Sequence, residues 1–516
     1  MRPGSYDEWV RRYDTLSTAD REALAAEEQG LRQRPLFSIL LPVFNPNLQW
    51  LREAIDSVKA QTYSRWQLCI ADDASTEARV RTFLSEEAKS DDRIALVLRA
   101  ANGHISACSN SALALARGEW CGLLDQDDLL APHALSLVAR EVNDKPAAGL
   151  IYSDEDFIDP AGGRTNPFLK PDWNPELFLA QNYINHFGAY RTDLLREIRG
   201  FREGFEGSQD YDLALRCIER LHRDQIRHIP RVLYHWRMVP GSLAEVRDAK
   251  PYAKDAARRA LEEHMQRRGI PARVEPRPEN VESHRVTYLA PLPAFELIEH
   301  DGSAAAMNRA AADATASVLV FVERGIEIDC VDDLLRHAAR AEVGAVGARV
   351  WSADGTLRNG GLILGLGGIA HEAHAGVPRG HGGFFNSTIL QRNCSAVSSA
   401  CFAVRGDVFR ALNGFDENNL KHRFHDVDFC LRAAERGLQI VWTPYTNPIY
   451  SGLTTAERSA PNDEAYMRKR WATTLPNDPF YNPSLALDLP EYELSFPPRW
   501  KDTRWDLSFA CASAAR

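Results

Sequence analysis

Residues 35–130 alternate between short apolar runs and longer amphipathic segments, and this alternation restricts the fold more than any other feature of the chain. The runs typical of buried strands are PLFSILLPVF (35–44), WQLCIAD (66–72), RIALVL (93–98) and EWCGLL (119–124). The segments with helical periodicity between them are LQWLREAIDSVKAQ (48–61), VRTFLSEEAK (80–89) and SACSNSALALAR (106–117). Alternation of this kind predicts an α/β fold built on a doubly wound, mostly parallel sheet.

Polar strings follow three of the expected strands, at the point where each strand ends. They are PVFN (42–45), ADDAS (71–75) and DQDD (125–128). Ligands of doubly wound sheets bind beyond the carboxyl ends of the strands, because these ends meet at one edge. The three strings therefore predict one binding site rather than three unrelated loops.

The string DQDD places three carboxylates within four positions. Asp125 and Asp127 alternate at a strand end, so both side chains can face one cation. Carboxylate oxygens suit Mg²⁺ or Mn²⁺, and such ions commonly bridge to substrate phosphates. A solvated loop that begins the following helix is the alternative reading.

Two further loops contain candidate ligand-binding residues. Asp72 or Asp73 can accept hydrogen bonds from a ribose or a base edge, although a helix cap or turn explains them as well. Asn102 and Gly103 precede a helix whose N-terminus can face a phosphate.

The remaining candidates lie further along the chain. In EGSQDYDLALR, Asp210 can act as a general base for an acceptor hydroxyl, with a helix cap as the alternative, and Glu206 can help to hold the acceptor. Asp154 and Glu155, in IYSDEDFID, can bind the acceptor or serve a structural role. His235, in VLYHWR, can complete a metal site or pack beside Trp236.

Changes in pattern predict five parts: a helical segment (1–34), a first α/β domain (35–245), a helical linker (246–285), a second body (286–485) and a tail (486–516). The two bodies resemble one another. GAYRTDLLREIRGFREGFEGSQDYDLALR in the first is echoed by CFAVRGDVFRALNGFDENNLKHRFHDVDFCLR in the second. A duplicated domain explains this better than chance.

The composition excludes several classes of protein. A net charge of −10 gives no support for broad nucleic-acid binding, so no nucleic-acid partner is expected. No apolar run reaches the length of a membrane span, and the N-terminus lacks the apolar core of a signal peptide. The nine cysteines form no CxxC pair and are expected to be buried free thiols. We therefore expect a cytoplasmic protein.

Taken in order, PVFN (42–45), ADDAS (71–75), SACSNSAL (106–113), LLDQDD (123–128) and GSQDYDLALR (207–216) resemble the family 2 glycosyltransferases of the GT-A fold. The ending DPFYNPSL (478–485) resembles two-domain bacterial members that act on O-antigens, capsules and related surface glycans. The resemblance implies an inverting transferase that uses Mn²⁺ or Mg²⁺. The implied donor is a UDP-, dTDP- or GDP-sugar, and the implied acceptor is a glycan or lipid-linked glycan.

The resemblance also implies roles for individual residues. Pro42, Val43, Asn45 and Asp73 match positions that hold the base and ribose, with Asp72, Asn102, Gly103 and Gln126 beside them. Asp125 and Asp127 match the metal motif, and Asp210 matches the catalytic base, with Gln209 in place of the usual glutamate. The position of the histidine that is common in this family is occupied by Val239. His235 is the expected third metal ligand, but it does not match the family motif.

The second body departs from the family pattern. It has Glu323-Arg324-Gly325 at the metal motif, and the segment before this motif is too short for a nucleotide-binding strand–helix–strand unit. We expect a degenerate, non-catalytic GT-A-like domain. A non-catalytic scaffold of a polysaccharide assembly complex is the alternative for the whole chain, and a metal-dependent nucleotidyltransferase is disfavoured because no Gly-rich basic loop follows the first strand. Peripheral attachment to the cytoplasmic face of the inner membrane and a homo-oligomer stay open.

Overall fold

The computed structural model describes residues 4–238, 251–277, 283–452 and 460–500. The chain forms two compact units. The first unit comprises residues 1–173, 182–268 and 496–516, and the second comprises residues 174–181 and 269–495.

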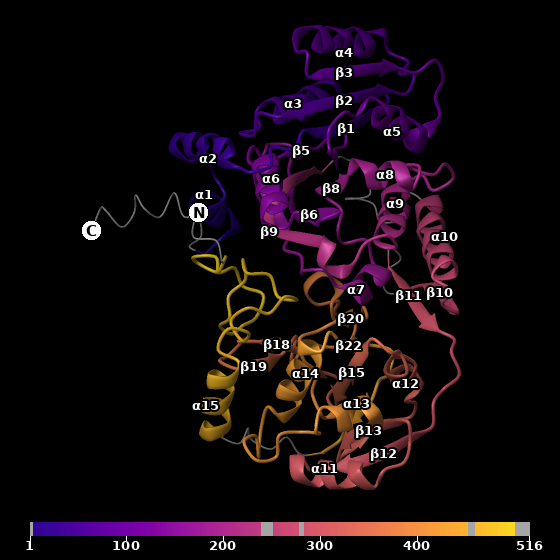
Figure 1. Cartoon of the computed structure of the whole chain (residues 1–516), viewed down its shortest axis with the longest axis vertical. Helices are drawn as coiled ribbons and strands as arrows, with labels where there is room; N and C mark the ends of the chain where they lie inside the picture. The colour runs from indigo at the N-terminus through magenta and orange to yellow at the C-terminus, as the bar shows by residue number, and fades with distance from the viewer. Residues whose placement is uncertain (1–3, 239–250, 278–282, 453–459, 501–516) are drawn as a thin grey trace, which may run out of the picture. The chain divides into compact units, whose positions relative to one another are not determined.

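A four-stranded parallel half-sheet forms the beginning of the first unit (Figure 1). Its elements are β1 (Phe37–Val43), α3 (Leu48–Lys59), β2 (Trp66–Asp72), α4 (Ala78–Ser90), β3 (Ile94–Leu98), α5 (His104–Leu115) and β4 (Trp120–Leu123). The strands lie in the order β3-β2-β1-β4, so each crossover carries a helix onto the sheet. The apolar runs are buried because helices cover the sheet: Phe37, Ile39 and Leu41 of β1 are all fully buried. The predicted α/β fold is confirmed here.

Mixed strands complete the nine-stranded sheet of the first unit. The later elements are β5 (Leu129–Leu130), α6 (Ala134–Asp144), β6 (Leu150–Ile158), β7 (Arg164–Phe168), β8 (Gly188–Arg191), α8 (Thr192–Glu197), α9 (Gln209–Ile218), a 3₁₀ turn (Arg223–Gln225), β9 (Ile226–Arg237) and α10 (Pro251–Arg267). The sheet continues from β4 through β8, β6 and β9 to β5, and β7 pairs with β6. β8 is antiparallel to both of its neighbours, β4 and β6. The sheet is therefore parallel in its first half and mixed in its second.

Two helices precede the sheet, α1 (Tyr6–Tyr13) and α2 (Thr18–Gly30), as the helical periodicity of residues 1–34 predicts. Trp9 of α1 is fully buried. A capping box begins α2: the Ser17 hydroxyl accepts from the backbone N–H of Asp20, and the Asp20 carboxylate accepts from the backbone N–H of Ser17. This reciprocal pair satisfies two backbone donors that the first helical turn leaves free.

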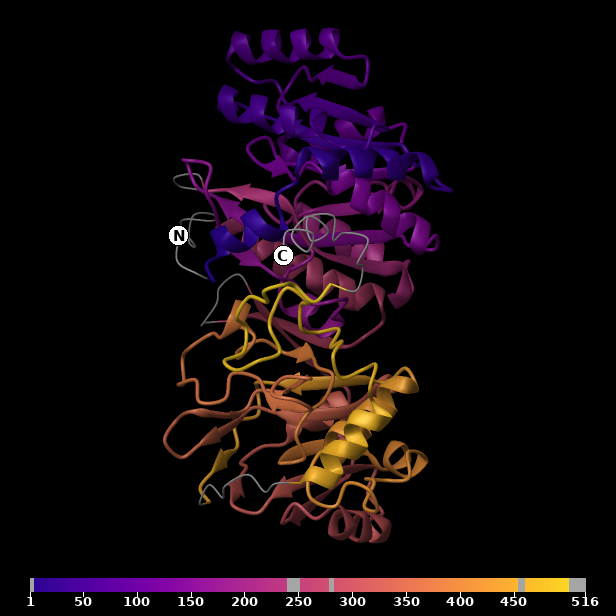
Figure 2. The same cartoon turned by 90° about the vertical axis from the view of Figure 1, so that its left-hand side faces the viewer.

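The second unit is built around a six-stranded sheet. Its elements up to the middle of the unit are β10 (Ala272–Pro276), β11 (His284–Tyr288), β12 (Phe295–His300), α11 (Ala304–Asp313), β13 (Val318–Glu323), β14 (Ile326–Glu327), α12 (Asp332–Ala338), β15 (Val343–Ala348), β16 (Val350–Ser352), β17 (Leu357–Asn359) and β18 (Leu362–Leu364). The others are β19 (Ala370–Glu372), a 3₁₀ turn (Phe384–Asn386), β20 (Arg392–Asn393), β21 (Cys401–Arg405), α13 (Gly406–Ala411), α14 (His425–Glu435), β22 (Gln439–Thr443), β23 (Ile449–Tyr450) and α15 (Pro461–Arg470). The yellow helix α15 in Figure 2 contributes Met467 to the core of this unit.

The strand order shows that the second unit repeats the first. The main sheet runs β12-β13-β21-β15-β22-β20, with the same sequence of parallel and antiparallel pairs as β1-β4-β8-β6-β9-β5. In the first unit, β2 and β3 extend the sheet beyond β1. The described part of the second unit has no corresponding strands beyond β12. The half that holds the ADDAS string in the first unit is therefore missing from the described part of the second unit.

Helix α7 (Pro175–Ala180) belongs to the second unit, although it lies within the sequence of the first. The Glu176 carboxylate is buried and pairs with Arg340 at 2.6 Å and with the amide of Gln391 at 2.9 Å. The Asn174 side chain donates to the carbonyl of Asn393 and accepts from its backbone N–H. The chain thus enters the second unit before it completes the first.

No helix in the described ranges is long and apolar enough to cross a bilayer. Eight cysteines are described as free thiols, of which Cys330 is exposed and the others are buried.

Candidate functional site

Hydrogen bonds join the loops that follow the parallel strands of the first unit. Gln126 accepts from the backbone N–H of Phe44 at 2.9 Å, which links the loop after β4 to the loop after β1. The backbone N–H of Asn45 donates to the Ser75 hydroxyl at 3.0 Å, and the Asn45 side chain accepts from Thr76, which links the loops after β1 and β2. The strings predicted to converge do lie at one edge of the sheet.

The two aspartates that follow β2 make different contacts. Asp73 is buried, pairs with Arg99 at 2.7 Å and accepts from the backbone N–H of Gly103 at 3.0 Å. Asp72 is also buried, and it accepts from the backbone N–H of Ser75 within the turn. Asp73 therefore joins the loop after β3, whereas Asp72 stabilises its own turn. Asn102 lies beside Asp73, since its amide donates to the Asp73 carbonyl at 3.3 Å.

The three carboxylates of DQDD have three environments. The Asp125 side chain is 45% exposed. Burial and the neighbouring charge of Asp125 raise the pKa of Asp127 to about 6. Asp128 is buried and accepts from the Tyr234 hydroxyl at 2.7 Å and from the backbone N–H of Arg237 at 2.8 Å. Asp128 is thus a structural contact to β9, whereas Asp125 keeps a partly exposed carboxylate.

One pocket brings residues from distant parts of the sequence together. Its polar lining consists of Asp125, Asn185, His186, Gln209, Asp210 and Ser109, and its apolar lining includes Pro42, Ile105 and Phe201. The predicted metal-motif residue Asp125 and the predicted base Asp210 therefore share a pocket with Pro42, a predicted donor contact.

Asp210 lies in the first turn of α9. Burial raises the pKa of Asp210 above its ordinary value, and the nearby charge of His186 opposes this rise. The Asn182 amide donates to Oδ2 of Asp210 at 3.2 Å.

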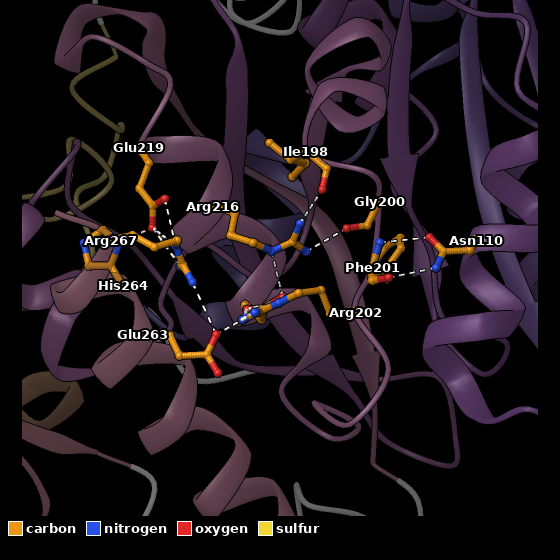
Figure 3. Close-up of polar contacts among 11 residues, drawn as sticks. Asn110, Ile198, Gly200, Phe201, Arg202, Arg216, Glu219, Glu263, His264 and Arg267 are labelled. Carbon is orange, nitrogen blue, oxygen red and sulfur yellow. Dashed lines mark hydrogen bonds and ion pairs between the residues drawn. The ribbon is translucent and has the colours of Figure 1, made fainter.

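Polar contacts hold α9 and the segments beside it in place, and Figure 3 shows most of them. Arg216 pairs with Asp212 at 2.9 Å and donates to the carbonyls of Ile198 and Gly200. The Asn110 side chain of α5 bonds both the N–H and the C=O of Phe201. Helix α10 also packs on α9, where Glu219 pairs with His264 and Arg267.

The second unit contains the same arrangement around α14. Arg432 pairs with Asp428 at 2.7 Å and donates to the carbonyls of Leu412 and Gly414. Asn308 bonds the N–H and C=O of Phe415, as Asn110 does for Phe201. Because the same contacts exist in both units, we infer that they hold α9 and α14 in position and are not specific to catalysis.

The repeat also relates the metal motif to the second unit. β4 pairs Trp120 with Arg191, directly before α8, and β13 pairs Val318 with Arg405, directly before α13. Counting forward along both strands places Glu323 at the position of Asp125 and Gly325 at the position of Asp127. Glu323 pairs with Arg358 at 2.9 Å, so a cation already neutralises it.

His186 is the pocket residue that sequence reasoning missed. Its ring stacks on Tyr234 with centroids 4.6 Å apart, and its Nε2 lies 3.7 Å from Oδ2 of Asp125. Burial would lower the pKa of His186, but its interaction with Glu155 and the charges of Asp125 and Asp128 raise it to about 9. No motif marks this histidine, because it lies in the irregular stretch NYINHFG.

The acids of β6 form buried ion pairs. Asp154 pairs with His228 at 2.9 Å, and Glu155 pairs with Lys170 at 3.1 Å. Asp156 pairs with Nδ1 of His235 at 2.6 Å.

Glu206 accepts twice from the backbone N–H of Gly204, within its own turn. The roles of Asp154, Glu155 and Glu206 toward an acceptor, and of His235 toward a metal, stay predictions.

The residues at this pocket fit a divalent cation that a substrate helps to bind. Among the described residues, no group of three or more Asp, Glu, His and Cys side chains forms a complete cation site. Asp125 is partly exposed, and Asp127 lies close enough to it that the charge of Asp125 raises the pKa of Asp127. Mg²⁺ is commonly held by one or two carboxylates together with substrate phosphates and water, so an incomplete protein site is the expected arrangement.

Residues 38–199 match the family model described as glycosyl transferase family 2. The uncharacterized protein y4gI of Sinorhizobium fredii is 38% identical to this chain, over 93% of this chain and 61% of that protein. The O-antigen biosynthesis protein RfbC of Myxococcus xanthus is 32% identical, over 93% of this chain and 42% of that protein. The chain therefore spans about two to three fifths of the length of these curated relatives.

Among solved structures, a fragment of S. aureus TarS (1–349) in complex with UDP-GlcNAc is 18% identical to the chain. The match covers 45% of this chain and 66% of that one, with a TM-score of 0.37.

Proposed function

Because residues 38–199 match the glycosyl transferase family 2 model, we propose that this protein is a metal-dependent, inverting glycosyltransferase. One observation carries the proposal: Asp125 and Asp210 line the same pocket. The first is the partly exposed acid of the metal motif and the second is a carboxylate suited to accept a proton. Relatedness to an O-antigen biosynthesis protein supports a glycan or lipid-linked glycan of a bacterial surface polysaccharide as the acceptor.

We propose that the loops after β1, β2 and β3 bind the nucleoside of a UDP-, dTDP- or GDP-sugar, through Pro42, Val43, Asn45, Asp73 and Asn102. Asp125 and Asp127 would hold a Mn²⁺ or Mg²⁺ ion, and such an ion would supply positive charge to the diphosphate leaving group. The hydrogen bond from the Phe44 backbone N–H to the Gln126 side chain keeps the metal-motif loop beside the nucleoside loop.

Asp210 accepts the proton of the acceptor hydroxyl, while the Asn182 amide donates to Oδ2 of Asp210. The deprotonated oxygen attacks the anomeric carbon from the face opposite the diphosphate, which inverts the configuration. The raised pKa of Asp210 makes it a stronger base than an exposed carboxylate, so proton transfer becomes easier.

We propose that the second unit binds no sugar nucleotide. Its described sheet ends at β12, without strands equivalent to β2 and β3. Its counterpart of Asp125 is neutralised by Arg358. Acceptor binding, packing or oligomerisation are the roles that this unit can still serve.

Calorimetric titration tests the donor site. UDP, dTDP and GDP and their sugars are titrated into the full chain with Mn²⁺, with Mg²⁺ or with EDTA. We expect one nucleotide to bind only with metal, and binding to weaken in Asp127→Ala. Absence of metal-dependent binding by the folded chain would favour the scaffold alternative.

A pair of variants tests the base. Asp210→Asn is expected to keep donor binding but to lose slow hydrolysis of the bound sugar nucleotide, measured as nucleotide release without acceptor. Asp426→Asn is the matched control, because Asp426 occupies the same helical position in α14. Equal hydrolysis by Asp210→Asn and wild type would remove Asp210 from this role.

A further inference from the structure

His186 lies in the pocket beside the metal motif, in a fixed orientation. Tyr234 stacks on its ring and Trp236 packs against it at 5.5 Å between centroids. The His186 backbone N–H donates to Glu155, and the Lys170 ammonium donates to the His186 carbonyl at 2.7 Å. The main chain and both ring contacts therefore hold the imidazole in place.

The two ring nitrogens of His186 face two different carboxylates. Nδ1 lies 3.6 Å from Oε2 of Glu155, and Nε2 lies 3.7 Å from Oδ2 of Asp125. Histidines that bind metals commonly direct one nitrogen to the ion and the other toward a carboxylate that orients the ring. Glu155 is placed for the second role, because it is buried and also paired with Lys170.

The separation of the two candidate ligand atoms is suited to a shared ion. Ligands bind Mg²⁺ at about 2.1 Å, so two ligands of one ion lie about 3–4 Å apart. The Nε2–Oδ2 distance of 3.7 Å falls in this range. His235, in contrast, already directs Nδ1 to Asp156 at 2.6 Å.

We propose that His186 binds the divalent cation of the donor site through Nε2, together with Asp125. The inference rests on the proposed function and replaces His235 as the histidine ligand. Glu155 and Lys170 are then positioning residues that orient the His186 ring.

Pulsed electron paramagnetic resonance of bound Mn²⁺ tests the inference, since it detects a nitrogen bonded directly to the ion. The full chain is loaded with Mn²⁺ alone and with Mn²⁺ and UDP, GDP or dTDP in turn. We expect ¹⁴N modulation in the wild type, and a ¹⁵N pattern after selective ¹⁵N-histidine labelling. The signal should vanish in His186→Gln and persist in the matched control His235→Gln. Mn²⁺ affinity of His186→Gln should also fall, because one direct ligand is lost.

The outcomes separate this inference from the proposed function. A wild-type complex of Mn²⁺ and nucleotide without a histidine signal overturns the inference and leaves the proposed function standing. A chain that binds no Mn²⁺ with any nucleotide contradicts both. If His186→Gln does not fold, His235→Gln decides: retention of the signal supports His186, and loss overturns it.

Discussion

The buried pair of Lys170 and Glu155 yields a prediction whose size follows from the structure. The Lys170 side chain is fully buried and that of Glu155 is 6% exposed. Among the described residues, Glu155 forms salt bridges with Lys170 and His186, and Lys170→Met removes the first of them. The substitution also leaves the carbonyls of Asn185 and His186 without the ammonium group that donates to them. Breaking a buried ion pair on one side costs about 3–5 kcal/mol, because the remaining charge stays buried.

The free energy of unfolding is measured by urea titration with pulsed hydrogen exchange and mass spectrometry, which reports on each unit separately. Glu155→Gln in the Lys170→Met background should recover about 2 kcal/mol, because no unpaired charge remains. The matched control is Arg220→Met, since Arg220 pairs with Glu197 at the surface and such pairs contribute about 1 kcal/mol or less. A loss below about 1 kcal/mol in Lys170→Met, or equal losses in the single and double variants, would refute the reasoning.

Three further predictions concern other parts of the chain. Burial, with the charge of Asp426, raises the pKa of Glu372 to about 7, so the folded second unit holds this proton more tightly than the unfolded chain. The contribution of Glu372 to stability should be greatest below about pH 4.5 and fall by about 2–3 kcal/mol up to pH 7, and thermal unfolding of Glu372→Gln should lack this contribution. In Gly118→Ala, the new Cβ would lie 2.3 Å from the Leu36 carbonyl oxygen, so we expect a loss of about 1–3 kcal/mol in urea unfolding. Asn182→Ala should slow sugar-nucleotide hydrolysis about tenfold without changing donor affinity, because one hydrogen bond to a charged group contributes about 1.5 kcal/mol.

Each of these predictions has an outcome that contradicts it. An unchanged pH profile in Glu372→Gln would mean that another group titrates. Gly118→Ala is compared with Gly30→Ala, where a Cβ meets nothing within 4 Å, and equal stability of the two variants would contradict the steric argument. A weaker donor affinity in Asn182→Ala would place Asn182 in the donor site instead.

Periodicity was sufficient to predict the parallel half of the fold. The strands of residues 35–124 are continuous apolar runs because helices cover both faces, and such runs are readily recognised. The mixed half was not predicted in detail, because the order of β8, β6 and β9 depends on pairings between distant segments. The position of α7 was not predicted for the same reason, because the helix is short and its partners lie far along the chain.

The candidate site was predictable where a motif follows a strand. Asp125 and Asp210 meet in one pocket, as the order of motifs indicates. His186 was not predictable, because its position depends on Tyr234, Glu155 and Lys170, which approach it only in the folded chain.

The insertion of α7 has a consequence for how the chain is synthesised. Residues 177–180 are buried in the folded protein, yet Asn174 meets Asn393 across 219 positions of sequence. At about 5–20 residues per second, the ribosome needs about 10–45 s to produce that partner. During this interval the native surface that covers α7 is incomplete, so the nascent chain is a target for chaperones until translation passes residue 393.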